Sequence, residues 1–218
     1  LIASMNRGGI QGAEWELNDP ITGATLESCL RYKLDGTKLL MRVDWSDRDS
    51  LETINACVAA LNQCQEGKVP VFLEPLPVHR DERGRVVVEK DPDALSRLVG
   101  VAAALGSSSA RLWLKLPYCN DYERVAGAST LPILLLGGAA VPNMGGFLEQ
   151  MEKGLRAGAN IRGTMLGRNI LYPASGDPVA AAMVVQKMVH DRWTAAKALS
   201  VLEAASKEES PEKTIVQG

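Results

Sequence analysis

The stretch Arg111-Leu-Trp-Leu-Lys-Leu-Pro117 alternates leucines with Trp113 and Lys115. Successive side chains of a β-strand point to opposite faces, so the three leucines form one apolar face while Trp113 and Lys115 share the other. An apolar face of this kind is expected to pack against helices. The stretch therefore predicts a buried strand that carries a lysine into the protein interior.

Similar apolar runs lie on both sides of this stretch and are separated by helical patterns. Strands are predicted at Leu1–Met5, Lys38–Val43, Val69–Glu74, Arg111–Leu116, Pro132–Leu136 and Ile161–Leu166. Helices are predicted at Thr25–Leu34, Asp49–Gln65, Asp91–Leu105, Asp121–Ala126 and Asn143–Ala157, and one or two more within Asp177–Leu202. Strands that alternate with helices, without hairpin turns between them, indicate a parallel α/β fold.

The predicted strands begin about 32 residues apart, which suits repeated βα units. Six units are visible, whereas a (β/α)8 TIM barrel has eight and typically about 250 residues. We therefore expect a TIM barrel that lacks its first two strands in this chain, with a single domain over residues 1–205 (strands 3–8) and a polar tail over 206–218. The alternative is a six-stranded doubly wound sheet. Its expected G-x-G-x-x-G turn is not matched by Asn6-Arg7-Gly8-Gly9 after the first strand.

The composition excludes several classes of function. The 218 residues include 24 Lys and Arg against 26 Asp and Glu, a net charge of −2, so the concentrated positive charge of a nucleic-acid-binding protein is missing. The longest apolar stretch, around residues 131–141, is far shorter than the ~20 residues that cross a bilayer. Four cysteines without C-x-x-C spacing are too few for a disulfide scaffold, so we expect reduced thiols and a cytoplasmic protein.

Charged side chains are predicted on the inner face of three neighbouring strands. The period-two pattern places Lys38, Arg42 and Asp44 there from one strand, Glu74 from the next and Lys115 from the third. Burying charge is costly, and barrel enzymes place their chemistry near the carboxyl ends of the strands. We therefore interpret these residues as a candidate active site. The alternative is a buried ion-pair network with a structural role only.

The residue types narrow the chemistry to that of an amine. The only two histidines are His79, in a predicted loop, and His190, in a late helix with no ligand-like residue at i+4, which argues against a His-based metal site. No G-x-S-x-G motif indicates a serine nucleophile. A lysine that is desolvated beside other cations favours its neutral, nucleophilic form and would attack a carbonyl carbon. Lys115 is the candidate nucleophile, and Glu74 could carry protons for it.

Glycines follow the last two predicted strands. Gly137 and Gly138 come after one strand, and Gly167, Arg168 and Asn169 come after the other. TIM barrels commonly bind phosphate at this position, where backbone N–H groups approach the anion and an arginine can clamp it. We predict a phosphate site here. The alternative is that these glycines form ordinary turns.

Several motifs together resemble the Schiff-base (class I) aldolase superfamily. They are Ser4-Met-Asn-Arg-Gly-Gly9, Trp113-Leu-Lys-Leu-Pro117, Leu131-Pro with Leu136-Gly-Gly138, and Gly167-Arg168 with Leu171-Tyr-Pro173 and Gly176-Asp177. The resemblance covers nearly the whole chain and is greatest to the bacterial (β/α)8 aldolase-like proteins associated with inositol catabolism. Tagatose-bisphosphate and deoxyribose-phosphate aldolases are more distant.

This resemblance implies a role for each candidate residue. Lys115 takes the position of the Schiff-base lysine, Glu74 that of the proton-transfer carboxylate and Lys38 that of a second active-site lysine. Gly137, Gly138, Gly167 and Arg168 take the position of the phosphate site. The inward-facing Arg42 and Asp44 and the loop residue Asn169 complete the predicted substrate-binding set. The implied reaction forms or cleaves a C–C bond in a phosphorylated ketose or keto acid, with dihydroxyacetone phosphate and a small aldehyde such as malonate semialdehyde as the product pair. No metal or other cofactor is implied.

Two other functions stay open on the same barrel. One is a phosphosugar isomerase or acyltransferase, and the other is a phosphosugar-binding barrel without catalysis. In each case the partner is a phosphorylated small molecule rather than a nucleic acid or a membrane, and we expect a homo-oligomer.

Overall fold

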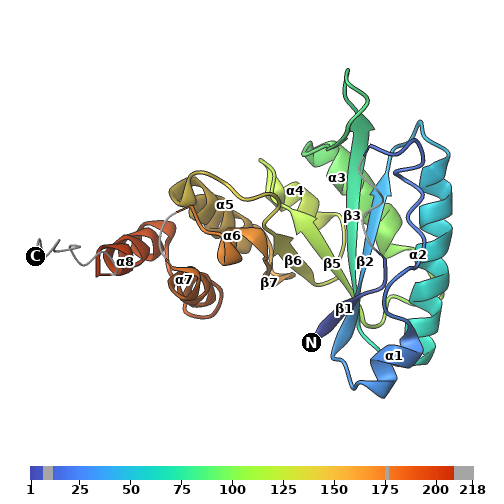
Figure 1. Cartoon of the computed structure of the whole chain (residues 1–218), viewed down its shortest axis with the longest axis horizontal. Helices are drawn as coiled ribbons and strands as arrows, with labels where there is room; N and C mark the ends of the chain where they lie inside the picture. Colours follow the sequence, from blue (N-terminus) through green and yellow to red (C-terminus); the bar gives the residue numbers. More distant parts are fainter. Residues whose placement is uncertain (7–11, 175–176, 209–218) are drawn as a thin grey trace, which may run out of the picture.

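The structure, a computed structural model, describes residues 1–6, 12–174 and 177–208. Six parallel strands pair in the order in which they occur along the chain (Figure 1). They are β1 (Ile2–Ser4), β2 (Gly36–Val43), β3 (Val71–Arg80), β5 (Leu112–Pro117), β6 (Ile133–Leu136) and β7 (Ile161–Met165). A short strand, β4 (Val86–Val88), pairs antiparallel with the end of β3. Each predicted parallel strand is therefore present, with its ends shifted by a few residues.

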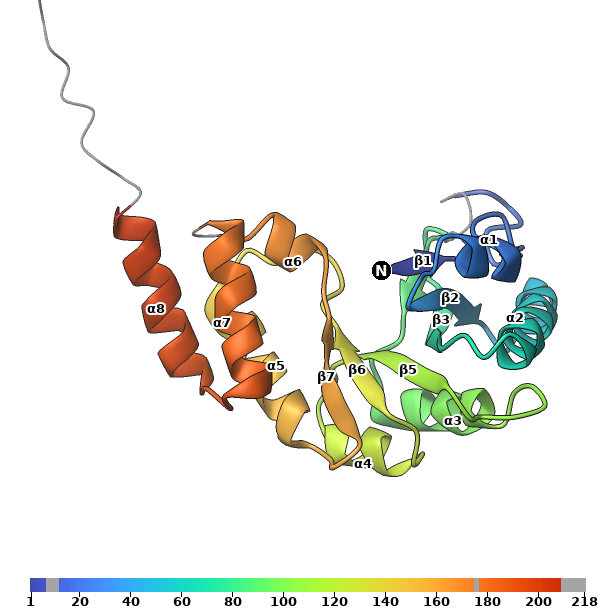
Figure 2. The same cartoon turned by 90° about the horizontal axis from the view of Figure 1, so that it is seen from below.

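The sheet curves, and most of the helices cover its convex side (Figure 2). The helices are α1 (Leu26–Arg31), α2 (Asp49–Glu66), α3 (Pro92–Ala103), α4 (Tyr122–Gly127), α5 (Met144–Arg156), α6 (Arg168–Leu171), α7 (Pro178–His190) and α8 (Ala195–Glu208). Helix α8 packs on α5 and α7, and α6 follows the carboxyl end of β7. A doubly wound sheet would carry helices on both faces. The described strands form part of a (β/α)8 barrel, with β1 and β7 as the two edges of the open arc.

Two helices, α3 and α7, begin at an aspartate followed by a proline, at the residues where the sequence predicts them. Asp91 accepts a hydrogen bond from the backbone N–H of Ala94 and is followed by Pro92 at the first helical position of α3. Asp177 and Pro178 start α7 in the same way. These two predicted helix starts are confirmed, and each side-chain cap contributes about 1 kcal/mol.

The core lies between the convex face of the sheet and the helices. The leucines at 112, 114 and 116 are at most 1% exposed, as the alternation in this strand predicts. Burying each of these side chains contributes about 1.5–3 kcal/mol. All four cysteines are free and buried. The lysine face of the same strand is left pointing into the concave side of the arc.

The structure differs from the sequence prediction after Glu74. The strand predicted to end there continues to Arg80 and turns into β4, so the chain forms a β-hairpin where none was expected. His79 belongs to this strand. In the sequence, Pro75 and Pro77 indicate the end of the strand, because proline donates no backbone hydrogen bond.

The sheet geometry explains why these prolines are tolerated. The N–H of Val71 donates to the carbonyl of Arg111 at 2.9 Å, so N–H groups at alternate positions along β3 face β5. Pairing with β5 ends at Leu73, before Pro75 and Pro77. The missing N–H groups therefore face away from β2, and the pairing of β3 with β2 continues to Pro77 without them.

The carboxyl-terminal part of the chain also differs in detail. The region Asp177–Leu202 forms two helices, α7 and α8, and the four-residue helix α6 lies directly after β7. Helix α8 runs to Glu208, beyond the predicted start of the tail at residue 206, and the rest of that tail lies outside the described residues. The same holds for Arg7, Gly8 and Gly9 of the amino-terminal motif and for Gly176. None of the helices in the described part is long and apolar enough to cross a membrane.

Candidate active site

Three charged side chains meet on the concave face of the sheet. Lys115 Nζ donates a hydrogen bond to Glu74 Oε2 at 3.0 Å, and Lys38 Nζ lies 2.9 Å from the same oxygen. The exposed fractions of the side chains are 16% for Lys115, 10% for Glu74 and 19% for Lys38. Two ammonium groups thus share one carboxylate in a poorly solvated place, and the group as a whole attracts an anionic ligand.

The strand register explains this meeting. Leu40 of β2 is paired with Glu74 of β3, and Leu73 of β3 is paired with Leu114 of β5. Glu74 and Lys115, the next residues along, therefore point into the barrel side by side. Lys38, two residues before Leu40, reaches Glu74 diagonally.

Apolar side chains flank the charged group along the strands. On the side of the amino ends, the rings of Phe72 and Trp113 pack with their centroids 5.7 Å apart. On the side of the carboxyl ends, a small buried cluster contains Leu17, Leu76 and Val78. The two lysines and Glu74 are therefore held between apolar layers, where an ionic interaction is stronger than in water.

Arg42 is engaged by two carboxylates that sequence reasoning missed. Its Nη1 lies 2.9 Å from Glu16 Oε1 and its Nη2 lies 3.9 Å from Asp19 Oδ2. Both acids belong to the loop between β1 and α1. Asp19 is 2% exposed, and burial raises the pKa of its carboxyl to about 6, although Arg42 and Lys38 pull it down. The sequence gives no signal for this contact, because the loop between β1 and α1 has no periodic pattern.

Asp44 has a local partner. Its Oδ1 accepts hydrogen bonds from the backbone N–H and the hydroxyl of Ser46, at 2.9 and 2.6 Å. The carboxylate therefore shapes the turn that leads into α2, and the structure does not bring it to Lys115 and Glu74. Together with His79 and Arg80, Asp44 lines a separate cleft of about 400 Å³.

The two glycine loops lie side by side and are tied together by Asn169. Its buried amide donates to the carbonyl of Gly137 at 2.7 Å and to that of Ala139 at 3.1 Å, and its Oδ1 accepts from the N–H of Val141 at 2.8 Å. A Cβ at position 137 would lie 3.0 Å from the Asn169 amide nitrogen, so glycine permits this close approach. The side chain of Asn169 is thus occupied in holding the loop after β6.

The other predicted phosphate-site residues are placed around this junction. Gly138 has a φ of +69°, which favours glycine, and turns the chain after β6. Gly167 precedes α6, and Arg168 is exposed on its first turn. The structure therefore brings the loops after β6 and β7 together at the barrel mouth, with an exposed arginine beside them.

The parallel strands, with helices on their convex side and a charged group on their concave face, define a partial (β/α)8 barrel. The chain belongs to the Cgl0159-like family, whose model matches residues 1–187. No curated protein matches the sequence significantly.

Solved structures agree with this assignment. Cgl0159 from Corynebacterium glutamicum is 35% identical over 88% of this chain and 64% of its own, with a TM-score of 0.83. An archaeal fructose 1,6-bisphosphate aldolase has 18% identity and a TM-score of 0.68, over 86% of this chain and 70% of that one. A Schiff-base-forming fructose-1,6-bisphosphate aldolase has 19% identity and a TM-score of 0.67, with the same coverage. The chain thus spans just under two thirds of the Corynebacterium protein, and the aldolases share its fold.

Proposed function

We propose that the protein is a Schiff-base aldolase that forms or cleaves a C–C bond in a phosphorylated ketose or keto acid. The observation that carries the proposal is the contact of Lys115 and Lys38 with one oxygen of Glu74 on the concave face of an aldolase-type barrel. This arrangement provides an amine, a proton acceptor beside it and a second cation.

Glu74 can convert Lys115 into a nucleophile. The carboxylate takes a proton from the Lys115 ammonium across the 3.0 Å hydrogen bond, and the neutral amine attacks the ketone carbon. The proton then passes to the former carbonyl oxygen to give a carbinolamine, which loses water to form an iminium ion. Overall, one ammonium and one ketone give one iminium and one water.

The iminium ion draws electrons from the neighbouring C–C bond. When a base removes the proton of the hydroxyl on the β-carbon, that bond breaks, an aldehyde leaves and the electron pair neutralises the iminium as an enamine. Protonation at carbon and hydrolysis release the ketone. Lys38 keeps a positive charge next to Glu74 and stabilises the carboxylate each time it gives up its proton.

The substrate phosphate is proposed to bind where the two glycine loops meet. Backbone N–H groups near Gly137, Gly138 and Gly167 and the exposed guanidinium of Arg168 suit an anion, and Asn169 holds the loops in place. We propose dihydroxyacetone phosphate as the ketone and a small aldehyde such as malonate semialdehyde as its partner. The link to inositol catabolism rests on the sequence motifs alone and stays a prediction.

Reductive trapping tests the proposal. Borohydride added with dihydroxyacetone phosphate should attach one reduced adduct to the peptide that contains Lys115, as read by mass spectrometry. Lys115→Met should take no label, whereas Lys153→Met, on the exposed side of α5, should be labelled like the wild type. Chelation with EDTA should leave the labelling unchanged.

Other outcomes would overturn parts of the proposal. A label on Lys38 would mean that the nucleophile is assigned to the wrong strand. Binding of the ketone without any label would favour a phosphosugar-binding barrel. Labelling without C–C cleavage, but with isomerisation of the substrate, would favour the phosphosugar isomerase.

A further inference from the structure

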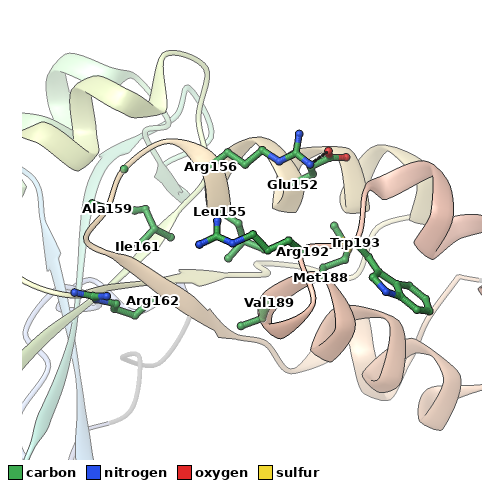
Figure 3. A pocket seen from close by; sticks show the side chains of 11 residues that line it. Glu152, Leu155, Arg156, Ala159, Ile161, Arg162, Met188, Val189, Arg192 and Trp193 are labelled. Atoms are coloured by element: carbon green, nitrogen blue, oxygen red, sulfur yellow. Dashed lines mark ion pairs between the residues drawn. The ribbon is translucent and has the colours of Figure 1, made fainter.

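A second cavity lies on the helix side of the sheet, at the amino end of β7. It has a volume of about 440 Å³ and is enclosed by α5, β7 and the end of α7 (Figure 3). Three arginines line it, one from each wall: Arg156 from α5, Arg162 from β7 and Arg192 just after α7. We propose that this cavity binds a small phosphorylated organic molecule, independently of the site around Lys115.

The charges in this cavity are unbalanced. Its one carboxylate, Glu152, pairs with Arg156 at 2.8 Å, and its other oxygen accepts a hydrogen bond from the N–H of Ala195 at 2.6 Å. Among the ion pairs of the described residues, none includes Arg162 or Arg192. Because the chain as a whole has a net charge of −2, this local excess of positive charge does not reflect general basicity.

The chain geometry directs Arg192 into the cavity. Its neighbour Asp191 pairs with Lys187 at 2.8 Å, one turn back along α7, so this acid is already engaged. Arg192 then has a φ of +55°, and this left-handed residue ends the helix. Figure 3 shows its side chain extending toward Arg162 and β7, while the ring of Trp193 turns to the opposite side.

The ligand class follows from the donors and from the cavity wall. A guanidinium presents parallel N–H groups that match two oxygens of a phosphate, so two arginines without a carboxylate partner suit a phosphate dianion. Leu155, Ile161 and Met188 supply an apolar surface beside them. A cavity of this size falls in the range of small-molecule sites, and a phosphate alone would fill only a small part of it. The expected ligand is a phosphate ester with a carbon skeleton, as in a nucleotide or a sugar phosphate.

This cavity is separate from the proposed active site. Ile161 is paired with Ile133, which is fully buried on the helix side of the sheet, whereas Lys115 points to the concave side. Binding here therefore needs neither Lys115 nor Glu74.

Titration calorimetry with adenosine monophosphate and with glucose 6-phosphate tests the proposal and distinguishes the two kinds of ester. At least one should bind the whole chain at one site, and should still bind at about 0.15 M salt, while adenosine and glucose should not bind. Arg162→Gln and Arg192→Gln should each weaken binding about tenfold or more, as expected for a lost charged hydrogen bond. Arg83→Gln, in the exposed β3–β4 turn, removes the same charge and should leave affinity unchanged.

Several results would overturn this site. One is that neither ester binds. Another is that Arg83→Gln loses as much affinity as Arg162→Gln or Arg192→Gln. The third is that the Arg162→Gln Arg192→Gln double variant binds as tightly as the wild type while keeping its native circular dichroism spectrum. Loss of binding in Arg168→Ala but not in Arg192→Gln would place the ligand at the proposed active site instead. Retained binding in Arg168→Ala supports the second site even if trapping at Lys115 fails.

Discussion

Lys115 donates its hydrogen bond to the same Glu74 oxygen that Lys38 approaches from the neighbouring strand. A carboxylate used only to neutralise one buried lysine would not need a second cation on the same atom. Two cations on one carboxylate give this group an excess of positive charge, whereas Arg42 nearby is matched by Glu16 and Asp19.

Glu74→Gln should lower kcat by about 10²-fold or more, because the amide keeps the shape of the side chain but cannot take the Lys115 proton. The measurement is the steady-state rate of aldol cleavage. Glu82→Gln, in the exposed β3–β4 turn, is the matched control and should keep its rate. An inactive variant that is also unfolded, or one with full turnover, would indicate a purely structural ion pair.

Lys38→Met should lower kcat while borohydride still labels Lys115. The reason is that Lys38 contacts Glu74 but is not expected to carry the imine, so its loss affects proton transfer by Glu74 rather than the nucleophile itself. Single-turnover trapping separates the two effects. If Lys38→Met takes no label although the variant is folded and binds the ketone, then Lys38 carries the imine or is required to form it.

The charged group could be predicted because β-strand alternation alone determines which side chains face the concave side. Leu114 and Lys115 are adjacent, yet one is fully buried against helices and the other meets Glu74. This alternation can be seen within each strand alone, so predicting which side chains face inward needed no knowledge of contacts between distant residues. Parallel strands with helical connections then placed Glu74 next to Lys115.

Residues in loops could not be predicted in this way. Glu16 and Asp19 reach Arg42 through a connection that has no periodic pattern, and its path depends on tertiary contacts such as the hydrogen bond from the Asp19 N–H to Thr53. Asn169 is a residue type that often binds ligands, but its side-chain amide is hydrogen-bonded to the backbone of the loop after β6. The hairpin after Glu74 was hidden because Pro75 and Pro77 resemble a strand end unless it is known that β3 keeps its pairing with β2 through both prolines.

Arg168→Ala should raise the KM for a phosphorylated substrate by about 10- to 100-fold, the equivalent of a lost charged hydrogen bond of about 1.5–3 kcal/mol. Arg168 is exposed, so folding should be unaffected. The test compares KM for a phosphorylated ketose and its unphosphorylated counterpart, with Arg31→Ala in α1 as the control. Equal losses toward both substrates would exclude Arg168 as the phosphate ligand.

Asn169→Ala should destabilise the protein by about 2–4 kcal/mol. The substitution removes three hydrogen bonds and leaves the carbonyl of Gly137 and the N–H of Val141 without their partner. Denaturant unfolding measures the change, and Asn160→Ala, which also removes three backbone contacts of a side-chain amide, provides a comparison. A change in KM with no change in unfolding free energy would mean that Asn169 contacts substrate directly.

Asp19 should make stability depend on pH. Its carboxyl has a pKa of about 6 in the folded protein against 3.8 for an unperturbed aspartate. Between these values the folded state keeps a proton that the unfolded state has lost, so stability falls as pH rises through this window and stays lower above it. The full cost is as much as about 3 kcal/mol at neutral pH.

Asp19→Asn removes this titration and keeps the shape of the side chain. Unfolding free energies measured in denaturant from pH 4 to pH 7 should therefore fall less in the variant than in the wild type, with most of the difference reached by pH 7. Glu66→Gln, exposed at the end of α2, should leave the wild-type profile unchanged. Parallel profiles for Asp19→Asn and wild type would show that the ion pair with Arg42 fully offsets the burial of this carboxylate.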